Sequence, residues 1–85
     1  MPPKLNIVFP SASDDLVHRI RNFAEDLQRA LASERAGQVE NMDTAVTSVV
    51  VAVGSTRMLG RATDLIKKAL RRNKFSSGVV IERQR

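Results

Sequence analysis

Nine basic residues lie between Ser55 and Arg85, where only Asp64 and Glu82 oppose them, so this part of the chain carries a charge of +7. The part from Met1 to Gly54 has five basic and seven acidic residues and carries −2. Clustered lysines and arginines can neutralise phosphates or bind carboxylates. The uneven charge therefore predicts a basic surface in the second half of the chain, suited to an anionic partner.

Five of these cations recur at helical spacing. At about 100° per residue they lie on one side of a helix, opposite Leu59, Ile66 and Ala69. We call them the basic stripe: Arg57, Arg61, Lys68, Arg71 and Arg72. Such a stripe can bind nucleic-acid phosphates or an acidic protein. It can also be a solvated helix face whose cations lie near the negative C-terminal end.

Asp64 lies within the same strip and dilutes its charge, whereas Lys67 and Lys74 widen it. Arg83 and Arg85 can add to it from the last strand and the tail.

Aromatic side chains that could stack on bases are scarce. The chain has no Trp or Tyr, and its three aromatic residues are Phe9, Phe23 and Phe75. We expect Phe9 and Phe23 to face the core. Single-stranded RNA platforms need aromatics on an open sheet face. Any binding to nucleic acid is therefore expected to involve the backbone and to depend little on sequence.

Residues suited to catalysis or metal binding are isolated. His18 is the only histidine, there is no cysteine, and the nearby acids Glu40 and Asp43 form a lone pair. These residues do not match a metal-ligand spacing. The run from Gly54 to Arg57 lacks the second glycine and the lysine of a P-loop, and we expect Ser55 or Thr56 to cap a helix. We therefore expect no enzyme activity, no cofactor and no metal.

The elements that position these residues follow from hydrophobic periodicity. Residues 4–9 alternate as a half-buried strand, and Ser11–Asp15 begins a helix with an apolar stripe. On its wet face Glu25 can pair with Arg21 and Arg29. Gly37 is expected to end this helix with a positive φ. The stripe comprises Leu16, Ile20, Phe23, Leu27, Ala30 and Leu31.

Three further segments complete the pattern. Residues 47–53 are rich in β-branched valines and predict a strand, and residues 79–83 alternate as a final strand. Between them, Leu59, Ala62, Ile66, Ala69 and Leu70 predict the inner stripe of a second helix, with Met58 and Leu65 at its edge. Residues 38–45 are mixed, and suit either an edge strand or a loop.

This order predicts an α+β fold, a ferredoxin-like βαββαβ sandwich with an antiparallel sheet and two helices on one face. If residues 38–45 are not a strand, the alternative is a three-stranded βαβαβ sheet. In the sandwich, four apolar residues occupy the open face of the sheet, where polar residues are usual. They are Val8, Val50, Ala52 and Val80.

Length and composition indicate one domain over residues 1–85. With 42% hydrophobic and 27% charged residues, the chain is typical of a globular protein. The longest apolar run, Val49 to Val53, is far shorter than the roughly 20 residues that a membrane span needs. We expect a soluble, cytoplasmic protein.

From Gly37 onward the chain has a recurring framework of turn glycines and strand valines: Gly37–Glu40, Val49–Gly54, Leu59, Ile66, Leu70 and Gly78–Arg83. This framework resembles the small ferredoxin-like proteins of bacterial genomes, mostly uncharacterised, some of which resemble toxin-neutralising immunity proteins. The resemblance covers about half of the chain and implies a stoichiometric protein-binding module without catalysis. Neutralisers of nucleases usually present acidic surfaces, whereas this chain is basic. Any toxin it binds is therefore expected to offer an acidic or apolar site.

Two functions follow from these patterns. The first is a non-enzymatic interaction module that binds a protein, itself or another, through its sheet face or its basic second helix. The alternative is a basic protein that binds the nucleic-acid backbone with the basic stripe. Salt separates the two, because backbone binding weakens steeply as salt rises whereas apolar association barely changes.

Overall fold

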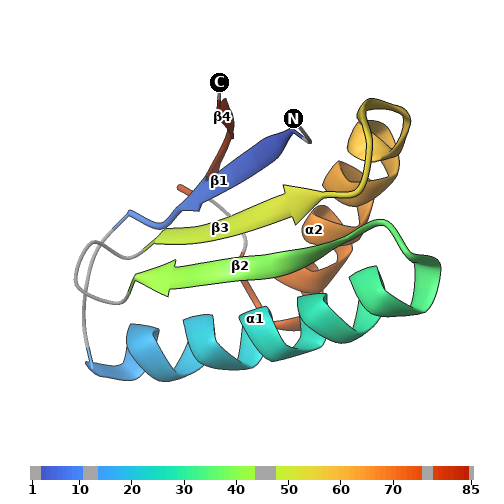
Figure 1. The fold of residues 1–85 in the computed structure, drawn as a ribbon. Coiled ribbons are helices and arrows are strands. Elements are labelled where there is room, and N and C mark those ends of the chain that lie inside the picture. The colour runs from blue at the N-terminus through green and yellow to red at the C-terminus, as the bar shows by residue number, and fades with distance from the viewer. Residues whose placement is uncertain (1–2, 11–13, 44–47, 76–77, 85) are drawn as a thin grey trace.

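A computed structural model describes residues 3–10, 14–43, 48–75 and 78–84 of the chain. The order of its elements, strand-helix-strand-strand-helix-strand, is the order predicted from the sequence (Figure 1). They are β1 (Lys4–Val8), α1 (Asp14–Glu34), β2 (Gly37–Asp43), β3 (Ser48–Val53), the short 3-10 helix η1 (Thr56–Met58), α2 (Leu59–Arg72) and β4 (Val80–Gln84). The protein is therefore an α+β protein.

The four strands form one antiparallel sheet in the order β2-β3-β1-β4. The three-stranded alternative is wrong, because β2 pairs with β3 from Gly37↔Val53 to Asp43↔Ser48. A shift in register between Val39 and Asn41 marks a β-bulge, which bends and twists this edge strand. The last residues of the ambiguous segment, Thr44 and Ala45, lie outside the described residues.

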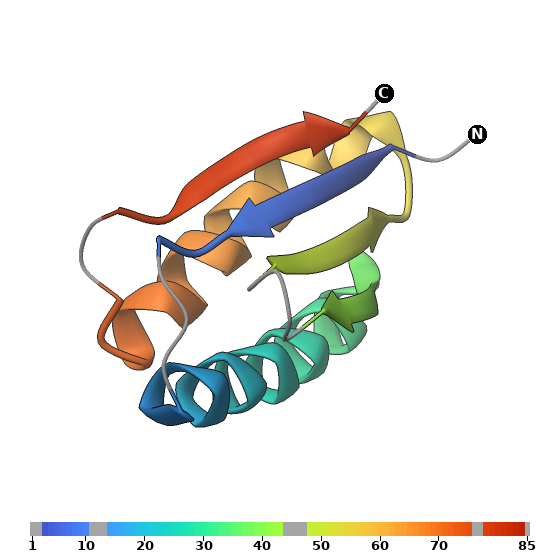
Figure 2. The ribbon, with the colours of Figure 1, turned by 90° about the vertical axis from the view of Figure 1, so that its left-hand side faces the viewer.

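Both helices cover the same face of the sheet (Figure 2). Burial alternates along β1 and β3, so that Leu5 and Ile7 face the helices together with Val49, Val51 and Val53. From β4, Ile81 packs against the same core. This period of two is the expected consequence of a sheet with one covered and one uncovered face.

The helix stripes fill the space over that face. On α1 the fully buried side chains are Ile20, Phe23, Leu27 and Leu31. On α2 the buried residues are Ala62, Leu65, Ile66, Ala69 and Leu70. Leu65 was expected at the edge of its stripe, yet it is 6% exposed. Its burial follows from α1 lying alongside α2, which covers that side of the helix.

Both helices end with a residue other than glycine in the left-handed conformation. After α1, Arg35 has φ 53°, and the N–H of Ala36 donates to the C=O of Leu31 at 3.0 Å. After α2, Lys74 has φ 63°, and the N–H of Phe75 donates to the C=O of Leu70 at 2.8 Å. These are Schellman motifs, each with an apolar residue just beyond the left-handed position. The prediction that Gly37 ends the first helix is wrong.

Gly37 is required by close packing at the start of β2. A Cβ built on Gly37 would lie 2.3 Å from the carbonyl oxygen of Ala52 on the neighbouring strand. Because no side chain can occupy that space, glycine is the residue that allows this pairing.

The approach to α2 also differs from expectation. Ser55 precedes η1 in an extended conformation and makes no side-chain capping hydrogen bond, and neither does Met58 at the N-cap of α2. The 3-10 turn itself uses the backbone, with the N–H of Met58 donating to the C=O of Ser55 at 3.0 Å. Within the described residues, neither helix has the length and apolar character needed to cross a membrane.

Candidate interaction surfaces

Arg61 of the basic stripe is held between the two helices. Its Nε donates to Oε1 of Glu34 on α1 at 2.7 Å, and its Nη2 contacts the same oxygen. Its Nη1 lies 3.6 Å from Oδ2 of Asp64, one turn along α2. The positive charge of Arg61 is therefore opposed by two carboxylates.

Carboxylates also oppose the positive charges of Lys68 and Arg72. The Nζ of Lys68 lies 3.4 Å from Oδ2 of Asp64, and Nε of Arg72 donates to Oδ2 of Asp26 at 2.8 Å. These pairs are partly exposed, and such pairs each stabilise a protein by no more than about 1 kcal/mol. They do, however, reduce the field that this side of α2 presents to a distant anion.

Asp26 is the acid most strongly affected by these contacts. The hydrogen bond from Arg72 and the positive charge of that guanidinium hold the pKa of the Asp26 carboxyl below its usual value, although burial opposes the change. Asn73 adds a longer hydrogen bond to the same oxygen, at 3.3 Å. Asp26 is therefore an anionic anchor for the C-terminal end of α2.

Arg57 and Arg71, the other members of the basic stripe, are exposed and make no ion pair within the described part of the chain. Lys67, Lys74 and Arg83 are also exposed and unpaired there. Position on the helix explains why some of these cations have carboxylate partners and others do not. Arg61 and Arg72 lie toward the acids of α1, whereas Lys67 lies toward β4. The side chain of Arg85 lies outside the described residues.

Arg19 has a role that sequence analysis did not find. Its Nη2 donates to the backbone C=O of Lys74 at 2.8 Å and of Asn73 at 3.3 Å, at the C-terminal end of α2. Its guanidinium also lies 4.5 Å from the centre of the Phe75 ring. A cation at this position stabilises the negative end of the helix and stacks on an aromatic ring. Nothing in the periodicity of α1 could have indicated a contact across 54 residues of sequence.

All three phenylalanines of the chain pack against one another. The ring centres of Phe9 and Phe75 lie 4.9 Å apart, and Phe23 contacts both rings in edge-to-face geometry. The expected core positions of Phe9 and Phe23 are confirmed. Because the cluster uses every aromatic residue in the sequence, none is left to stack on a base from the open face.

The open face of the sheet brings together the four apolar residues expected there. Val8 pairs with Val80, Val50 pairs with Asn6, and Ala52 pairs with Lys4. Strand alternation places these residues opposite the buried side chains of β1 and β3. Val80 is 50% exposed and is the large hydrophobic residue that stands out among the described ones. We call Val8, Val50, Ala52 and Val80 the sheet-face patch.

Polar groups surround and interrupt this patch. The Nζ of Lys4 extends to Oε1 of Glu40 at 2.6 Å, across the strand that carries the small Ala52. At the centre of the face, Oδ1 of Asn6 is inaccessible to solvent and has no hydrogen-bond partner. An unpaired buried oxygen of this kind destabilises a protein, by about 1 to 3 kcal/mol in mutational data.

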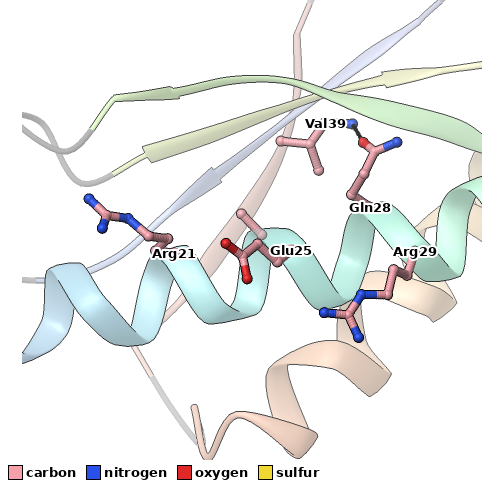
Figure 3. A pocket seen from close by; sticks show the side chains of 6 residues that line it. Arg21, Glu25, Gln28, Arg29 and Val39 are labelled. Atoms are coloured by element: carbon pink, nitrogen blue, oxygen red, sulfur yellow. Dashed lines mark hydrogen bonds between the residues drawn. The ribbon is translucent and has the colours of Figure 1, made fainter.

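A shallow hollow of about 680 Å³ lies between α1 and β2 (Figure 3). Arg21, Glu25, Gln28 and Arg29 line it from α1, and Val39 lines it from β2. No ion pair joins Glu25 to either arginine, so the two pairs expected from helical spacing are not formed. Oε1 of Gln28 instead accepts a hydrogen bond from the backbone N–H of Val39 at 2.7 Å.

The residues considered for catalysis or metal binding belong to two elements, with His18 on α1 and Glu40 and Asp43 on β2. His18 is exposed on α1, and Glu40 is engaged by Lys4. The side chain of Asp43 lies outside the described residues. No cluster of His, Cys, Asp and Glu suited to a metal ion occurs in the described part of the chain.

Comparisons with protein-family models, curated proteins and solved structures found no match to this chain.

Proposed function

We propose that this chain is a small non-enzymatic interaction module that binds a protein partner, either a second copy of itself or another protein, through the sheet-face patch. The observation that carries the proposal is the exposed apolar character of that face. Helices cover the opposite face, whereas Val80 and the partly exposed Val8, Val50 and Ala52 are left uncovered. Contiguous exposed apolar residues rimmed by polar ones mark contact sites in soluble proteins.

Asn6 lies at the centre of the same face, between Val50 of β3 and Glu82 of β4. The rim of the patch carries charge of both signs, with the Lys4–Glu40 pair on one side and Glu82 on β4. Protein interfaces usually combine exposed apolar residues with polar groups at the rim.

We infer a ferredoxin-like arrangement as the architecture of the module. Taken from β4, the sheet order is β4-β1-β3-β2, and the elements follow one another as βαββαβ. This is the split βαβ pattern, in which both crossover helices lie on one face of the sheet and leave the other available.

The nucleic-acid alternative receives less support. Three of the five cations in the basic stripe already have carboxylate partners, and the aromatic residues are in the core. Backbone binding would then depend on the unpaired cations alone.

Light scattering coupled to size exclusion tests the proposal for a second copy. If the wild-type chain is a dimer, Val50→Asp should give a folded monomer, because a carboxylate cannot be desolvated at the centre of an apolar interface. Glu25→Gln, a change on α1 away from the sheet, is the matched control and should keep the dimer. A dimer that persists in Val50→Asp contradicts binding through this face.

If the wild-type chain is a monomer, a photo-crosslinking amino acid at position 80 tests for another protein in cells. Position 32, exposed on α1, is the control position. A discrete crosslinked product at position 80 alone supports the proposal. Products at both positions, or at neither, contradict it.

A further inference from the structure

The two edges of the sheet differ in whether their outward backbone N–H and C=O groups have hydrogen-bond partners. Edge strands expose unpaired N–H and C=O groups that can pair with another chain, and proteins usually protect them. At the β2 edge, Gln28 accepts the hydrogen bond of the Val39 N–H, and the bulge at Val39 breaks the regular ladder. The β2 edge is therefore closed by α1 and by its own irregularity.

The register of β1 identifies the groups that are free at the β4 edge. The C=O of Pro3 accepts a hydrogen bond from the N–H of Val53, so odd-numbered residues of β1 bond to β3 and even-numbered residues bond to β4. On β4, the residues opposite the even positions are Val80, Glu82 and Gln84. The backbone groups of Ile81 and Arg83 therefore point outward.

The same rule applied to β2 makes Val39 point outward, in agreement with its hydrogen bond to Gln28. For Ile81 and Arg83 no hydrogen bond to the outer backbone groups is found in the described part of the chain. β4 lies at the margin of the sheet with α2 behind it (Figure 2). The β4 edge is thus an open template for another strand.

A groove of about 490 Å³ runs beside this open edge, between β4 and α2. Leu5, Leu59 and Ile81 contribute apolar surface, and Lys67 and Arg83 contribute charge. The remaining lining residues are Gly60 and Thr63. A Cβ at Gly60 would meet no atom within 4 Å, so packing within the fold does not require glycine there. Glycine at this position leaves the groove wider than any other residue would.

The charge beside the groove has one sign. Lys67 and Arg83 make no ion pair in the described residues, and Arg71 lies one turn beyond Lys67 on the same exposed side of α2. A second copy paired edge to edge about a twofold axis would place these cations opposite their own equivalents. Like charges in such positions are unfavourable. The charge therefore favours an acidic occupant over a second copy.

We propose that the β4 edge binds an extended acidic segment of a partner protein, which adds a fifth strand to the sheet. The backbone of that segment pairs with the outward N–H and C=O groups of Ile81 and Arg83. An apolar side chain of the segment lies in the groove, and flanking carboxylates meet Lys67 and Arg83. Main-chain hydrogen bonds with pockets for alternate side chains are the established physics of strand addition. The site is separate from the sheet-face patch and goes beyond the function proposed for it.

Fluorescence anisotropy with a labelled peptide, Thr-Glu-Thr-Val-Thr-Glu-Thr, tests the proposal. Alternation places both glutamates and the valine on one face of the peptide strand. We expect micromolar binding by the wild-type protein, and at least about tenfold weaker binding by the double variant Lys67→Glu/Arg83→Glu. Arg29→Glu reverses an exposed cation on α1 that makes no ion pair in the part of the chain that the structure describes, and it should change the affinity by less than about twofold. Circular dichroism verifies that each variant is folded.

Two further peptides separate strand addition from attraction between charges. A peptide with lysines in place of its glutamates should not bind. An acidic peptide that is N-methylated at its valine and the following threonine should bind at least about tenfold more weakly, because it loses its central hydrogen-bond donors and its methyl groups obstruct the approach of the two backbones. If the methylated peptide binds as tightly as the unmethylated acidic peptide, strand addition is wrong. If Arg29→Glu weakens binding as much as Lys67→Glu/Arg83→Glu does, the placement of the site is wrong. Failure of the wild-type protein to prefer the acidic peptide overturns the whole proposal.

Val50→Asp distinguishes this site from the sheet-face patch. It should retain peptide binding, because Val50 lies on β3, on the face of the sheet opposite the groove. Loss of peptide binding in folded Val50→Asp would contradict the placement of the site at the β4 edge. The outcome for self-association in the same variant remains a separate measurement of the proposed function.

Discussion

Single residues on α1 determine how α2 is held. Arg19 binds the carbonyl groups of Asn73 and Lys74 just after α2, Asp26 binds Arg72, and Glu34 binds Arg61 near the start of α2. Residues later in α1 contact residues earlier in the segment that contains α2, so the two helices are antiparallel neighbours. Each contact is worth about 1 kcal/mol or less at a partly exposed site. Their main effect is to fix the relative register of the helices.

Asp26 gives a pH dependence that can be measured. Because its pKa in the folded state is lowered, its contribution to stability is present above the ordinary aspartate value of 3.8 and is lost as the pH falls through the lowered value. We expect Asp26→Asn to reduce the free energy of unfolding at pH 7 by no more than about 1 kcal/mol. At about pH 2 the difference from wild type should be smaller, because the stabilising contribution of the carboxylate decreases as the pH falls through the lowered pKa of Asp26.

Urea unfolding at both pH values measures this difference. Glu25→Gln is the matched control, because Glu25 is an exposed acid on the same helix without an ion pair in the described residues. A loss in Asp26→Asn that is equally large at both pH values would show that the carboxylate charge is not the cause.

At the scale of elements, the two helices stop by the same device. A left-handed basic residue, Arg35 or Lys74, is followed by a buried or half-buried apolar residue, Ala36 or Phe75. The cation suits the negative end of the helix, whereas its Cβ makes the left-handed conformation unfavourable. The sequence therefore retains a strained position at each helix end.

Replacing these residues with glycine should stabilise the protein. We expect Arg35→Gly and Lys74→Gly each to raise the free energy of unfolding by up to about 1 kcal/mol, since glycine adopts positive φ without a steric penalty. Lys67→Gly, at an exposed interior position of α2, is the control and should lower it by about 1 kcal/mol. Thermal and urea unfolding measure all three variants. Destabilisation of Arg35→Gly comparable with that of Lys67→Gly would contradict the assigned backbone strain.

At the scale of the whole molecule, the net charge of +5 is not spread evenly over the surface. Acids of α1 and Asp64 neutralise the side of α2 that faces α1. Cations without an ion pair among the described residues remain on the outer side of α2 and near β4, at Lys67, Arg71 and Arg83. The fold thus leaves an apolar sheet face and a cationic sheet edge as two distinct surfaces.

This distribution changes the expectation for nucleic acid. We expect duplex DNA to bind weakly at about 50 mM salt and to dissociate at about 200 mM, as a few phosphate contacts would produce. Replacing Arg57, Lys67 and Arg71 with Ala should remove this binding. Replacing the paired Arg61, Lys68 and Arg72 with Ala should weaken it less, because carboxylates already neutralise those cations.

Anisotropy titrations with labelled duplex DNA and single-stranded RNA at both salt concentrations make this comparison. Micromolar or tighter binding at about 50 mM salt that collapses at about 200 mM would favour the nucleic-acid alternative over the protein-interaction module. A larger loss in the Arg61/Lys68/Arg72 variant would contradict the importance given to the ion pairs.

The sequence by itself determined the elements and their faces. Alternation in residues 4–8 and 48–53 and the apolar stripes of the two helices specify which side of each element is buried, because those periods belong to the local geometry of strands and helices. The placement of Val8, Val50, Ala52 and Val80 on one face followed from the same alternation. The sequence left residues 38–45 ambiguous between an edge strand and a loop. Their pattern is mixed and polar, and the pairing of β2 with β3 forms only in the folded sheet.

The tertiary structure decided which charges are free and which edge is open. Helical spacing predicts that Arg61, Lys68 and Arg72 share a side of α2, but it cannot show that Asp26 and Glu34, distant in the sequence, lie beside two of them. It likewise could not show that Gln28 accepts a hydrogen bond at one edge of the sheet, while the outward backbone groups of Ile81 and Arg83 at the other edge have no partner among the described residues. Ion pairs and edge hydrogen bonds join residues far apart in the chain, so only the packing of one element against another determines them.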